Sequence, residues 1–189
     1  MMQDLSISFT NALESGDLDF LAEVAECLRK YISRSEAPPL LELINTRIVP
    51  QIIELLDPKF YHNEKLMYEC SWIMTNIASG EQKYVQYLVD LDLIPKALNL
   101  FSHPSLQVKE NALWILANIA GEDISYRDLL LERDIVMHVK NLLSGLDDTV
   151  EENFLVQIAW LISDLVRGNP YPEFEQVNYL LSYSLNFIE

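Results

Sequence analysis

One short segment occurs three times along the chain, and this repetition restricts the fold more than any other feature. The segment beginning at Ser71 reads SWIMTNIASG, the copy 42 positions later reads LWILANIAG, and a third copy after a further 46 positions reads AWLISDLVRG. A chain that repeats one unit at a nearly constant interval stacks the copies, because each unit can bury its apolar face only against its neighbours. The sequence therefore predicts a linear array of similar units.

The segments between these copies repeat as well. Residues 93–100, LIPKALNL, resemble residues 135–142, IVMHVKNL, at the same interval of 42, and residues 48–55, IVPQIIEL, are an earlier relative. A proline in the first turn is compatible with a helix, because its missing N–H would have no helical partner there. Each unit is therefore predicted to hold a short, a medium and a long helix. In one unit these helices are expected at 82–91, 94–101 and 105–120, with His103-Pro104 separating the last two.

The long helix of that unit has one apolar stripe with three- and four-residue spacing, which is the pattern of a buried helix face. Trp114 and Asn118 are four positions apart, so they lie on one face of the helix, along the edge of the stripe. Gly121 follows the helix and is expected to end it in a left-handed conformation. The stripe consists of Val108, Ala112, Ile115, Leu116 and Ile119.

Intervals of about 40–47 residues are typical of armadillo and HEAT arrays. We predict an all-α fold, a right-handed α-solenoid of about four armadillo repeats, with residues 1–189 as a single domain. Helices are also expected at 18–33, before Pro38-Pro39, at 40–44, and at 174–188, after the break at Pro170-Tyr171-Pro172. The predicted parts are an N-terminal segment, 1–17, a first partial unit, 18–39, three repeats, 40–80, 81–121 and 122–168, and a truncated C-terminal unit, 169–189.

The charge balance limits the classes of partner. The chain has 13 basic and 29 acidic residues, a formal net charge of −16. A surface of this sign repels phosphate backbones, so nucleic acid is not an expected partner. It attracts cationic ligands, although composition alone favours an acidic surface that only maintains solubility.

The sequence contains no pattern typical of a membrane protein, a metal-binding protein or an enzyme. No apolar run reaches the roughly 20 residues that span a bilayer, so no membrane association is expected. Cys27 and Cys70 lie in apolar helical patterns and give neither a disulfide framework nor zinc spacing. His62, His103 and His138 are far apart, and no phosphate-binding loop or nucleophile motif is present. We therefore expect no enzyme activity, no metal and no cofactor.

The repeated tryptophans suggest a binding surface. Indole faces attract ammonium and guanidinium groups and pack against the methylene stems of Lys and Arg. An Asn amide has both a donor and an acceptor, so it can bind the N–H and C=O of an extended peptide. A single Trp at helical spacing more often belongs to a core, but three copies in phase favour a ladder. The ladder consists of Trp72 with Asn76, Trp114 with Asn118, and Trp160 with Asp164.

The segments 72–80, 109–122 and 160–168 resemble importin alpha (karyopherin alpha), the adaptor family that recognises nuclear localisation signals. Residues 28–39 resemble that family's first armadillo unit, and residues 167–174 resemble its fourth-to-fifth unit junction. The resemblance extends from about residue 18 to residue 188. It implies recognition of Lys/Arg-rich peptides or cargo proteins and a location in cytoplasm and nucleus. The chain is expected to lack the family's basic importin-beta-binding segment and the C-terminal half of its array.

The resemblance also implies which residues bind the peptide. The tryptophans would be shelves for basic side chains, Asn76 and Asn118 would bind the peptide backbone, and Glu122 with the Gly80 carbonyl would hold a critical Lys. Asp164 stands where the family has an Asn, so it is expected either to contact a cation or to pair with Arg167 on the same face. The implied site consists of Trp72, Asn76, Gly80, Glu110, Trp114, Asn118, Glu122, Gln157, Trp160, Asp164 and Arg167.

A second hypothesis is structural. The chain would then be a shortened armadillo scaffold that serves as a subunit or assembly adaptor in a larger complex. The last helix would expose an apolar face with no long helix after it, and such faces usually mark contact sites. A homodimer or partner-protein contact is expected there through Tyr179, Leu180, Leu181, Tyr183, Leu185 and Ile188.

Overall fold

A computed structural model describes residues 1–34, 37–147 and 149–186, with side chains up to residue 180. These residues form twelve α-helices, one 3-10 helix and no strand. The predicted all-α class is confirmed. The elements are α1 (Met2–Ser15), α2 (Leu18–Ser33), α3 (Leu40–Asn45), α4 (Val49–Glu54), η1 (Pro58–Phe60), α5 (Glu64–Ala78), α6 (Gln82–Asp90), α7 (Leu93–Leu100), α8 (Leu106–Glu122), α9 (Ile124–Glu132), α10 (Ile135–Ser144), α11 (Glu152–Val166) and α12 (Phe174–Asn186).

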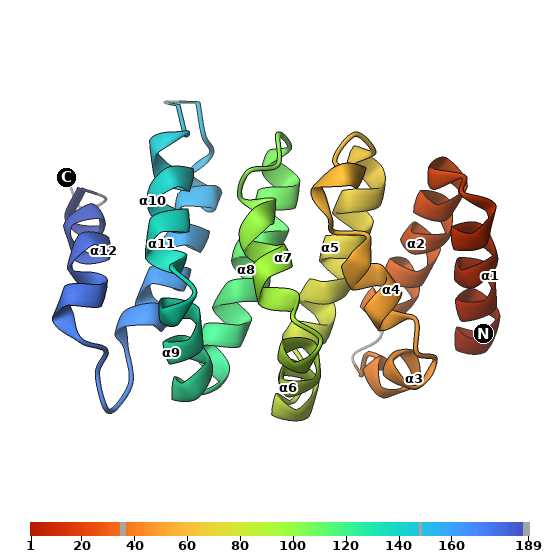
Figure 1. Ribbon diagram of the computed structural model, residues 1–189, viewed down its shortest axis with the longest axis horizontal. Helices are drawn as coiled ribbons and strands as arrows, with labels where there is room; N and C mark the ends of the chain where they lie inside the picture. The colour runs from red at the N-terminus through yellow and green to blue at the C-terminus, as the bar shows by residue number, and fades with distance from the viewer. Residues whose placement is uncertain (35–36, 148, 187–189) are drawn as a thin grey trace.

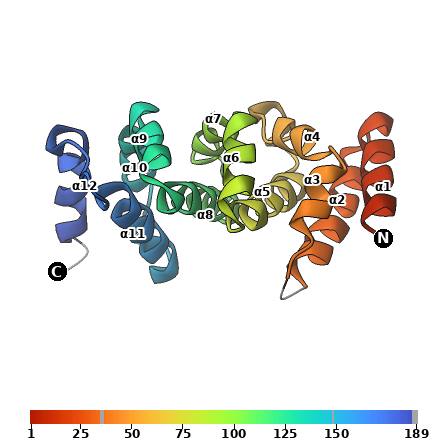
Figure 2. The same cartoon turned by 90° about the horizontal axis from the view of Figure 1, so that it is seen from below.

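The helices form an elongated stack that runs from α1 at one end to α12 at the other (Figure 1). The long helices α2, α5, α8 and α11 pack successively against one another. The shorter helices α6, α7, α9 and α10 lie on the other side of this row (Figure 2). One face of the molecule is therefore built from the long helices alone.

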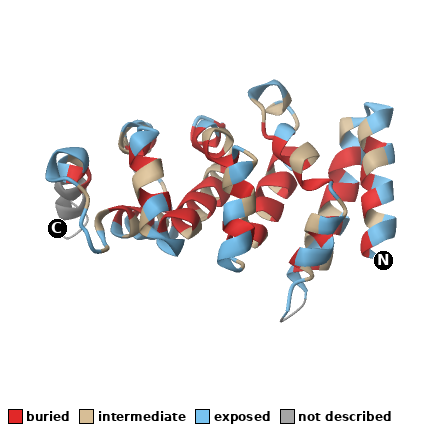
Figure 3. Ribbon diagram, turned by 60° about the horizontal axis from the view of Figure 1, so that its bottom comes forward, coloured by how far each residue is buried: buried red, intermediate tan, exposed pale blue. Residues whose placement is uncertain are grey.

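The core follows the helix contacts along the whole stack. Buried residues concentrate where successive helices face each other (Figure 3). In α8 the predicted stripe is confirmed, since Val108, Ala112, Ile115, Leu116 and Ile119 are all fully buried. Burial of a large aliphatic side chain contributes about 1.5–3 kcal/mol to the stability of the fold. Because these buried side chains lie in the contacts between successive long helices, the contacts hold the stack together.

The N-terminal helix α1 was not expected from the sequence. Phe9 and Ala12 are fully buried in the α1–α2 contact, whereas Gln3, Ser8 and Asn11 on α1 are exposed. Helix α1 therefore packs its apolar face on α2, while Ile7 on its outer side is 51% exposed. The first long helix, α2, has the predicted bounds 18–33.

The expectation that Gly121 ends the long helix in a left-handed conformation is wrong. Helix α8 continues through Gly121 to Glu122, and Asp123 adopts an extended φ of −153°. The Asp123 carboxylate accepts the Ser125 N–H at 2.9 Å and so begins α9 at once. The glycines with a left-handed φ are Gly16, at 72°, and Gly168, at 114°.

The last helix, α12, contacts α10 and α11 rather than leaving its whole apolar face open. Leu180 is fully buried and Tyr179 is half-buried, with the Lys140 ammonium 4.5 Å from the Tyr179 ring centroid. Leu180 therefore belongs to the core, which corrects the expectation that it forms a partner contact. Ile188 and the side chains of Leu181, Tyr183 and Leu185 lie outside the described part of the chain.

Among the described residues, no helix is both long and apolar enough to cross a bilayer.

Candidate functional site

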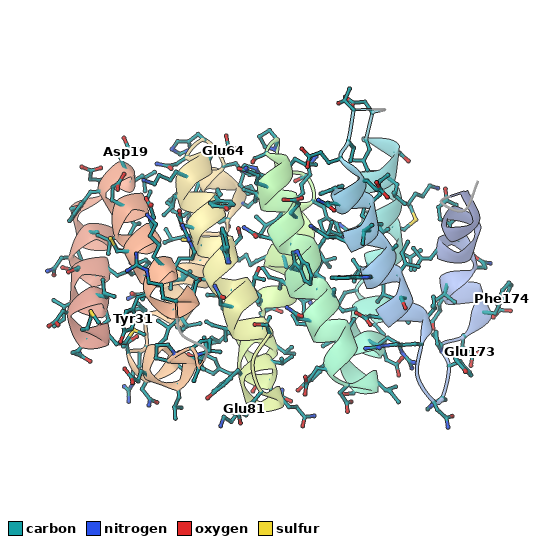
Figure 4. All side chains as sticks on the ribbon, turned by 180° about the vertical axis from the view of Figure 1, so that it is seen from behind. Asp19, Tyr31, Glu64, Glu81, Glu173 and Phe174 are labelled. Atoms are coloured by element: carbon teal, nitrogen blue, oxygen red, sulfur yellow. The ribbon has the colours of Figure 1, made fainter. Side chains whose placement is uncertain are left out.

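The three repeated tryptophans lie on three consecutive long helices. Trp72 lies on α5, Trp114 on α8 and Trp160 on α11, and these helices lie side by side when the molecule is viewed from behind (Figure 4). On each helix the indole lies at the edge of the buried apolar stripe. Trp72 and Trp114 are half-buried, and Trp160 is 52% exposed. The side chains are therefore accessible at the surface rather than enclosed by helix packing.

Ring contact joins two of the three indoles, and the third shares a hollow with one of them. The rings of Trp114 and Trp160 meet edge to face, with centroids 5.1 Å apart. Trp72 and Trp114 both line one open hollow of about 360 Å³. The other residues lining this hollow are Tyr68, Thr75, Gln107, Glu110 and Asn111.

Glu110 supplies the carboxylate of this hollow. Burial raises its pKa, and repulsion from Glu151 adds to the rise, whereas a hydrogen bond with Gln157 opposes it. A carboxylate whose charged form is disfavoured gains stability when a cation approaches it. Two aromatic walls with such a carboxylate between them match the shape and charge of a basic side chain.

The two Asn residues of the ladder are placed differently. The Asn76 Nδ2 donates to the Trp72 carbonyl at 3.1 Å and to the Ser33 hydroxyl at 3.2 Å, so its donor is already used within the protein. Its Oδ1 is left as the acceptor for a peptide N–H. The Asn118 side chain is half-buried and has no hydrogen-bond partner among the described residues. Asn118 therefore keeps both its donor and its acceptor for a ligand.

Of the two alternatives for Asp164, the structure shows the internal pair. The Arg167 Nη2 lies 2.9 Å from the Asp164 Oδ1 and also donates to the Gly121 carbonyl at 3.5 Å. Burial raises the pKa of Asp164, and Arg167 opposes that rise. A second hollow, of about 270 Å³, has Glu122, Asp164 and Arg167 in its lining.

The remaining expected residues have mixed placements. Gly80 lies between helices, where a Cβ would come 2.7 Å from the Tyr84 ring and 2.9 Å from Leu40. That close approach explains the glycine by packing. Glu122 is exposed at the end of α8, in the second hollow. Gln157 contacts Glu110 and keeps its buried Oε1 without a partner among the described residues.

The structure adds residues that the sequence reasoning missed. Tyr68 packs edge to face on Trp72, with centroids 5.3 Å apart, and its four-residue spacing from Trp72 was the available signal. The Arg29 guanidinium carbon lies 4.5 Å from the centroid of the Trp72 ring. The Arg29 guanidinium also binds the Glu69 carboxylate through two hydrogen bonds, of 2.6 and 3.2 Å. No local pattern predicts this pair, because the two residues lie on different helices, 40 positions apart.

Arg127 is a further residue with no signal in the sequence. Its side chain is only 2% exposed, and its Nη1 donates to the carbonyls of Arg167, at 2.7 Å, and Pro170, at 2.9 Å. It holds the segment between α11 and α12 in place, where Gly168 leaves room for the guanidinium. No group of three or more His, Cys, Asp or Glu side chains in the described part of the chain is placed to hold a metal ion.

Comparisons with known proteins agree with this architecture. Residues 81–121 match the Armadillo/beta-catenin-like repeat. A designed armadillo repeat protein, solved in complex with the peptide (KR)4, superposes with a TM-score of 0.75 at 22% identity, over 96% of this chain and 70% of that one. The armadillo repeats only protein from Plasmodium falciparum superposes with a TM-score of 0.71 at 14% identity, over 92% and 83%. The chain therefore has the fold of armadillo-repeat proteins.

Within that class the sequence is importin-alpha-like. It is 35% identical to importin subunit alpha-1b of Oryza sativa over 93% of this chain and 32% of that protein. It is 31% identical to importin subunit alpha-6 of Arabidopsis thaliana over 88% of this chain and 30% of that protein. The chain thus spans about a third of the length of these relatives.

Proposed function

We propose that this chain is a non-enzymatic binding module for extended Lys/Arg-rich peptides of the nuclear-localisation-signal type. The observation that carries the proposal is the aromatic-walled hollow between Trp72 and Trp114, which contains the partly buried carboxylate of Glu110. The charged group of a ligand Lys or Arg side chain in this hollow offsets the desolvation of Glu110. The methylene stem of that ligand side chain packs on the indoles.

Trp160 and Asn118 extend the site along the stack. Trp160 offers a half-exposed ring beside Trp114, and Asn118 offers an amide for the backbone of a bound peptide. The importin subunits that resemble this chain and the designed armadillo protein solved with (KR)4 support the same ligand class. Under this proposal the protein acts in the cytoplasm and the nucleus, with basic cargo proteins as its partners.

The proposal is tested with fluorescence anisotropy of a labelled (KR)4 peptide, with an uncharged (QS)4 peptide of the same length as the control ligand. We expect a Kd of about 1 µM or lower for (KR)4. Trp114→Ala is expected to weaken binding about 3- to 30-fold, the range that one cation–π contact provides.

Phe20→Ala is the matched control variant, because Phe20 is an exposed aromatic side chain that lies in neither hollow of the groove. It should bind (KR)4 as the wild type does. Unchanged binding of (KR)4 to folded Trp114→Ala would contradict the proposed function, and so would equal binding of (QS)4.

A second candidate function is assembly, favoured by two exposed aromatic side chains near the C-terminal end. Tyr171 is 77% exposed and Phe174 is 65% exposed, and Phe174 points away from the stack at its edge (Figure 4). Such side chains are typical of contact surfaces. Self-association through them is tested by light scattering across a concentration series, in which a Tyr171→Ser/Phe174→Ser variant should be more monomeric than the wild type.

A further inference from the structure

The long helix α8 begins at a residue that a histidine ring fixes in place. The Ser105 N–H donates to the His103 Nδ1 at 3.0 Å, and the Ser105 carbonyl accepts the Lys109 N–H at 3.3 Å in the first turn of the helix. Ser105 is the N-cap of α8, but its own side chain makes no capping hydrogen bond within the described residues. The imidazole of His103 therefore supplies the side-chain acceptor that orients the chain where α8 starts.

Four Asp side chains make the same turn elsewhere in the chain, each accepting the N–H of the residue two positions further on. They are Asp17, Asp57, Asp123 and Asp147, with distances of 3.1, 3.2, 2.9 and 2.9 Å. An Asp carboxylate remains an acceptor down to about pH 4. A histidine Nδ1 accepts only while it carries no proton. The start of α8 therefore depends on a group that titrates much closer to neutral pH than the four carboxylates do.

The surroundings of His103 favour its neutral form. The ring is fully buried, its Nε2 has no hydrogen-bond partner among the described residues, and the Tyr61 ring meets it edge to face with centroids 4.8 Å apart. Burial has the largest effect and holds the pKa of His103 below its ordinary value of 6.5. The Tyr61 backbone and the Glu64 carboxylate favour the charged form, whereas the Lys109 ammonium opposes it.

Protonation would reverse the role of the Nδ1 atom. The Nδ1–H and the Ser105 N–H would then be two donors that face each other, so the hydrogen bond between them would be lost. The imidazolium would also be buried beside the N-terminus of α8, where the helix dipole disfavours a cation. Both costs are relieved when the turn opens locally and exposes the ring to water.

We propose that His103 is an acid-sensitive switch at the start of α8, whose neutral ring fixes Ser105 and whose protonated ring releases the first turn of the helix. The first two turns carry Gln107 and Glu110, which line the hollow beside Trp72 and Trp114. Acid therefore loosens one wall of that hollow. The switch itself is a property of the fold, and only its consequence for a bound peptide rests on the proposed function.

The direction of the effect follows from the lowered pKa of the buried ring. In the opened turn His103 regains its ordinary pKa of 6.5, so opening takes up a proton below that pH. The contribution of His103 to the closed turn is therefore complete above pH 6.5 and is lost as the pH falls below it. Between about pH 7.5 and pH 5.5, the equilibrium constant for opening should rise about 5- to 10-fold.

The test is amide hydrogen exchange, followed by NMR at several pH values and corrected for the intrinsic exchange rate. In the wild type, the protection of the Ser105 and Lys109 amides should fall about 5- to 10-fold from pH 7.5 to pH 5.5. In His103→Asn the side-chain oxygen can accept the Ser105 N–H without titrating, so the change should stay below about 2-fold. His62→Asn is the matched control, because His62 is exposed, and it should behave as the wild type does.

Protection that is independent of pH in the wild type would overturn the inference, and so would an equal fall in folded His103→Asn. If His103→Asn does not fold, the NMR titration of the His103 ring in the wild type decides, since a pKa of 6.5 or above excludes the switch.

A peptide that binds the hollow should hold the turn closed. With (KR)4 at about 100 times its Kd, the protection of both amides at pH 5.5 should rise about 10-fold or more. Bound peptide without this rise would overturn the connection between the switch and the hollow. A complete lack of (KR)4 binding at every pH would instead refute the proposed function, while the exchange data without peptide would still decide on the switch.

Discussion

Arg167 and Asp164 form an ion pair at the C-terminal end of α11, with the Arg167 Nη2 2.9 Å from the Asp164 Oδ1. The Arg167 side chain is largely exposed, and Asp164 is half-buried in the second hollow. The protein thus neutralises one of the carboxylates that a basic peptide would seek.

Removal of Arg167 should strengthen the binding of basic peptides. In Arg167→Ala the Asp164 carboxylate loses its internal partner and becomes available to a ligand cation, so we expect about 3-fold tighter binding of (KR)4 by anisotropy. In the double variant Asp164→Asn/Arg167→Ala the gain should disappear. Tighter binding that persists in the double variant would show that Asp164 is not its cause.

Trp160 should matter more for binding than for stability. Its ring is half exposed, and among the described residues its ring contact is with Trp114 alone, so Trp160→Ala should lower the free energy of unfolding by about 1 kcal/mol, the scale of one aromatic pair. The same change should weaken (KR)4 binding about 3- to 30-fold. Urea unfolding and anisotropy on the same preparation check both values, and a stability loss above about 3 kcal/mol would place Trp160 in the core instead.

Binding should depend on pH through Glu110. The pKa of this carboxyl is raised by burial and by Glu151, so it takes up a proton at a higher pH than an ordinary Glu. Peptide binding should therefore weaken as the pH falls through this raised pKa, because the groove loses the negative charge of Glu110. In Glu110→Gln the affinity should be lower at neutral pH, and this part of the pH dependence should be absent.

The same raised pKa has the opposite consequence for stability. Above the unfolded pKa the folded state binds more protons at Glu110 than the unfolded state does, so this residue's contribution to stability falls as the pH rises through the folded pKa. In Glu110→Gln the free energy of unfolding should fall less between acidic and neutral pH than it does in the wild type, which urea unfolding at several pH values measures. An unchanged pH profile would contradict the burial of Glu110.

Arg127 should be among the most sensitive positions for stability. Its removal leaves the carbonyls of Arg167 and Pro170 without their donor and opens a cavity beside α9, so Arg127→Ala should lower the free energy of unfolding by about 3 kcal/mol. Arg133→Ala is the control, because Arg133 is exposed and its pair with Asp92 is long, at 3.6 Å. Its cost should stay below about 1 kcal/mol.

The repeat spacing was sufficient to predict the solenoid and the approximate helix bounds. The apolar stripe of each long helix is accompanied by a tryptophan at the same place, namely Trp72, Trp114 and Trp160. Helix periodicity alone places residues four positions apart on one face. For that reason the indoles and their Asn or Asp neighbours were found without coordinates. Local pattern was weaker at the ends of the array, where α1 has no repeated relative in the chain, and at Gly121, which sits inside α8.

The class of fold and the face that bears the ladder could be predicted from the amino-acid pattern, because both follow from periodicity within single helices. The contacts between side chains on different helices became visible in the folded chain alone. The contact of Arg29 with Trp72 and Glu69 joins side chains on α2 and α5, and the Arg127 contacts join α9 to the segment after α11. Such contacts depend on the rotation and spacing of neighbouring helices, which the packing of whole interfaces sets and no local pattern encodes.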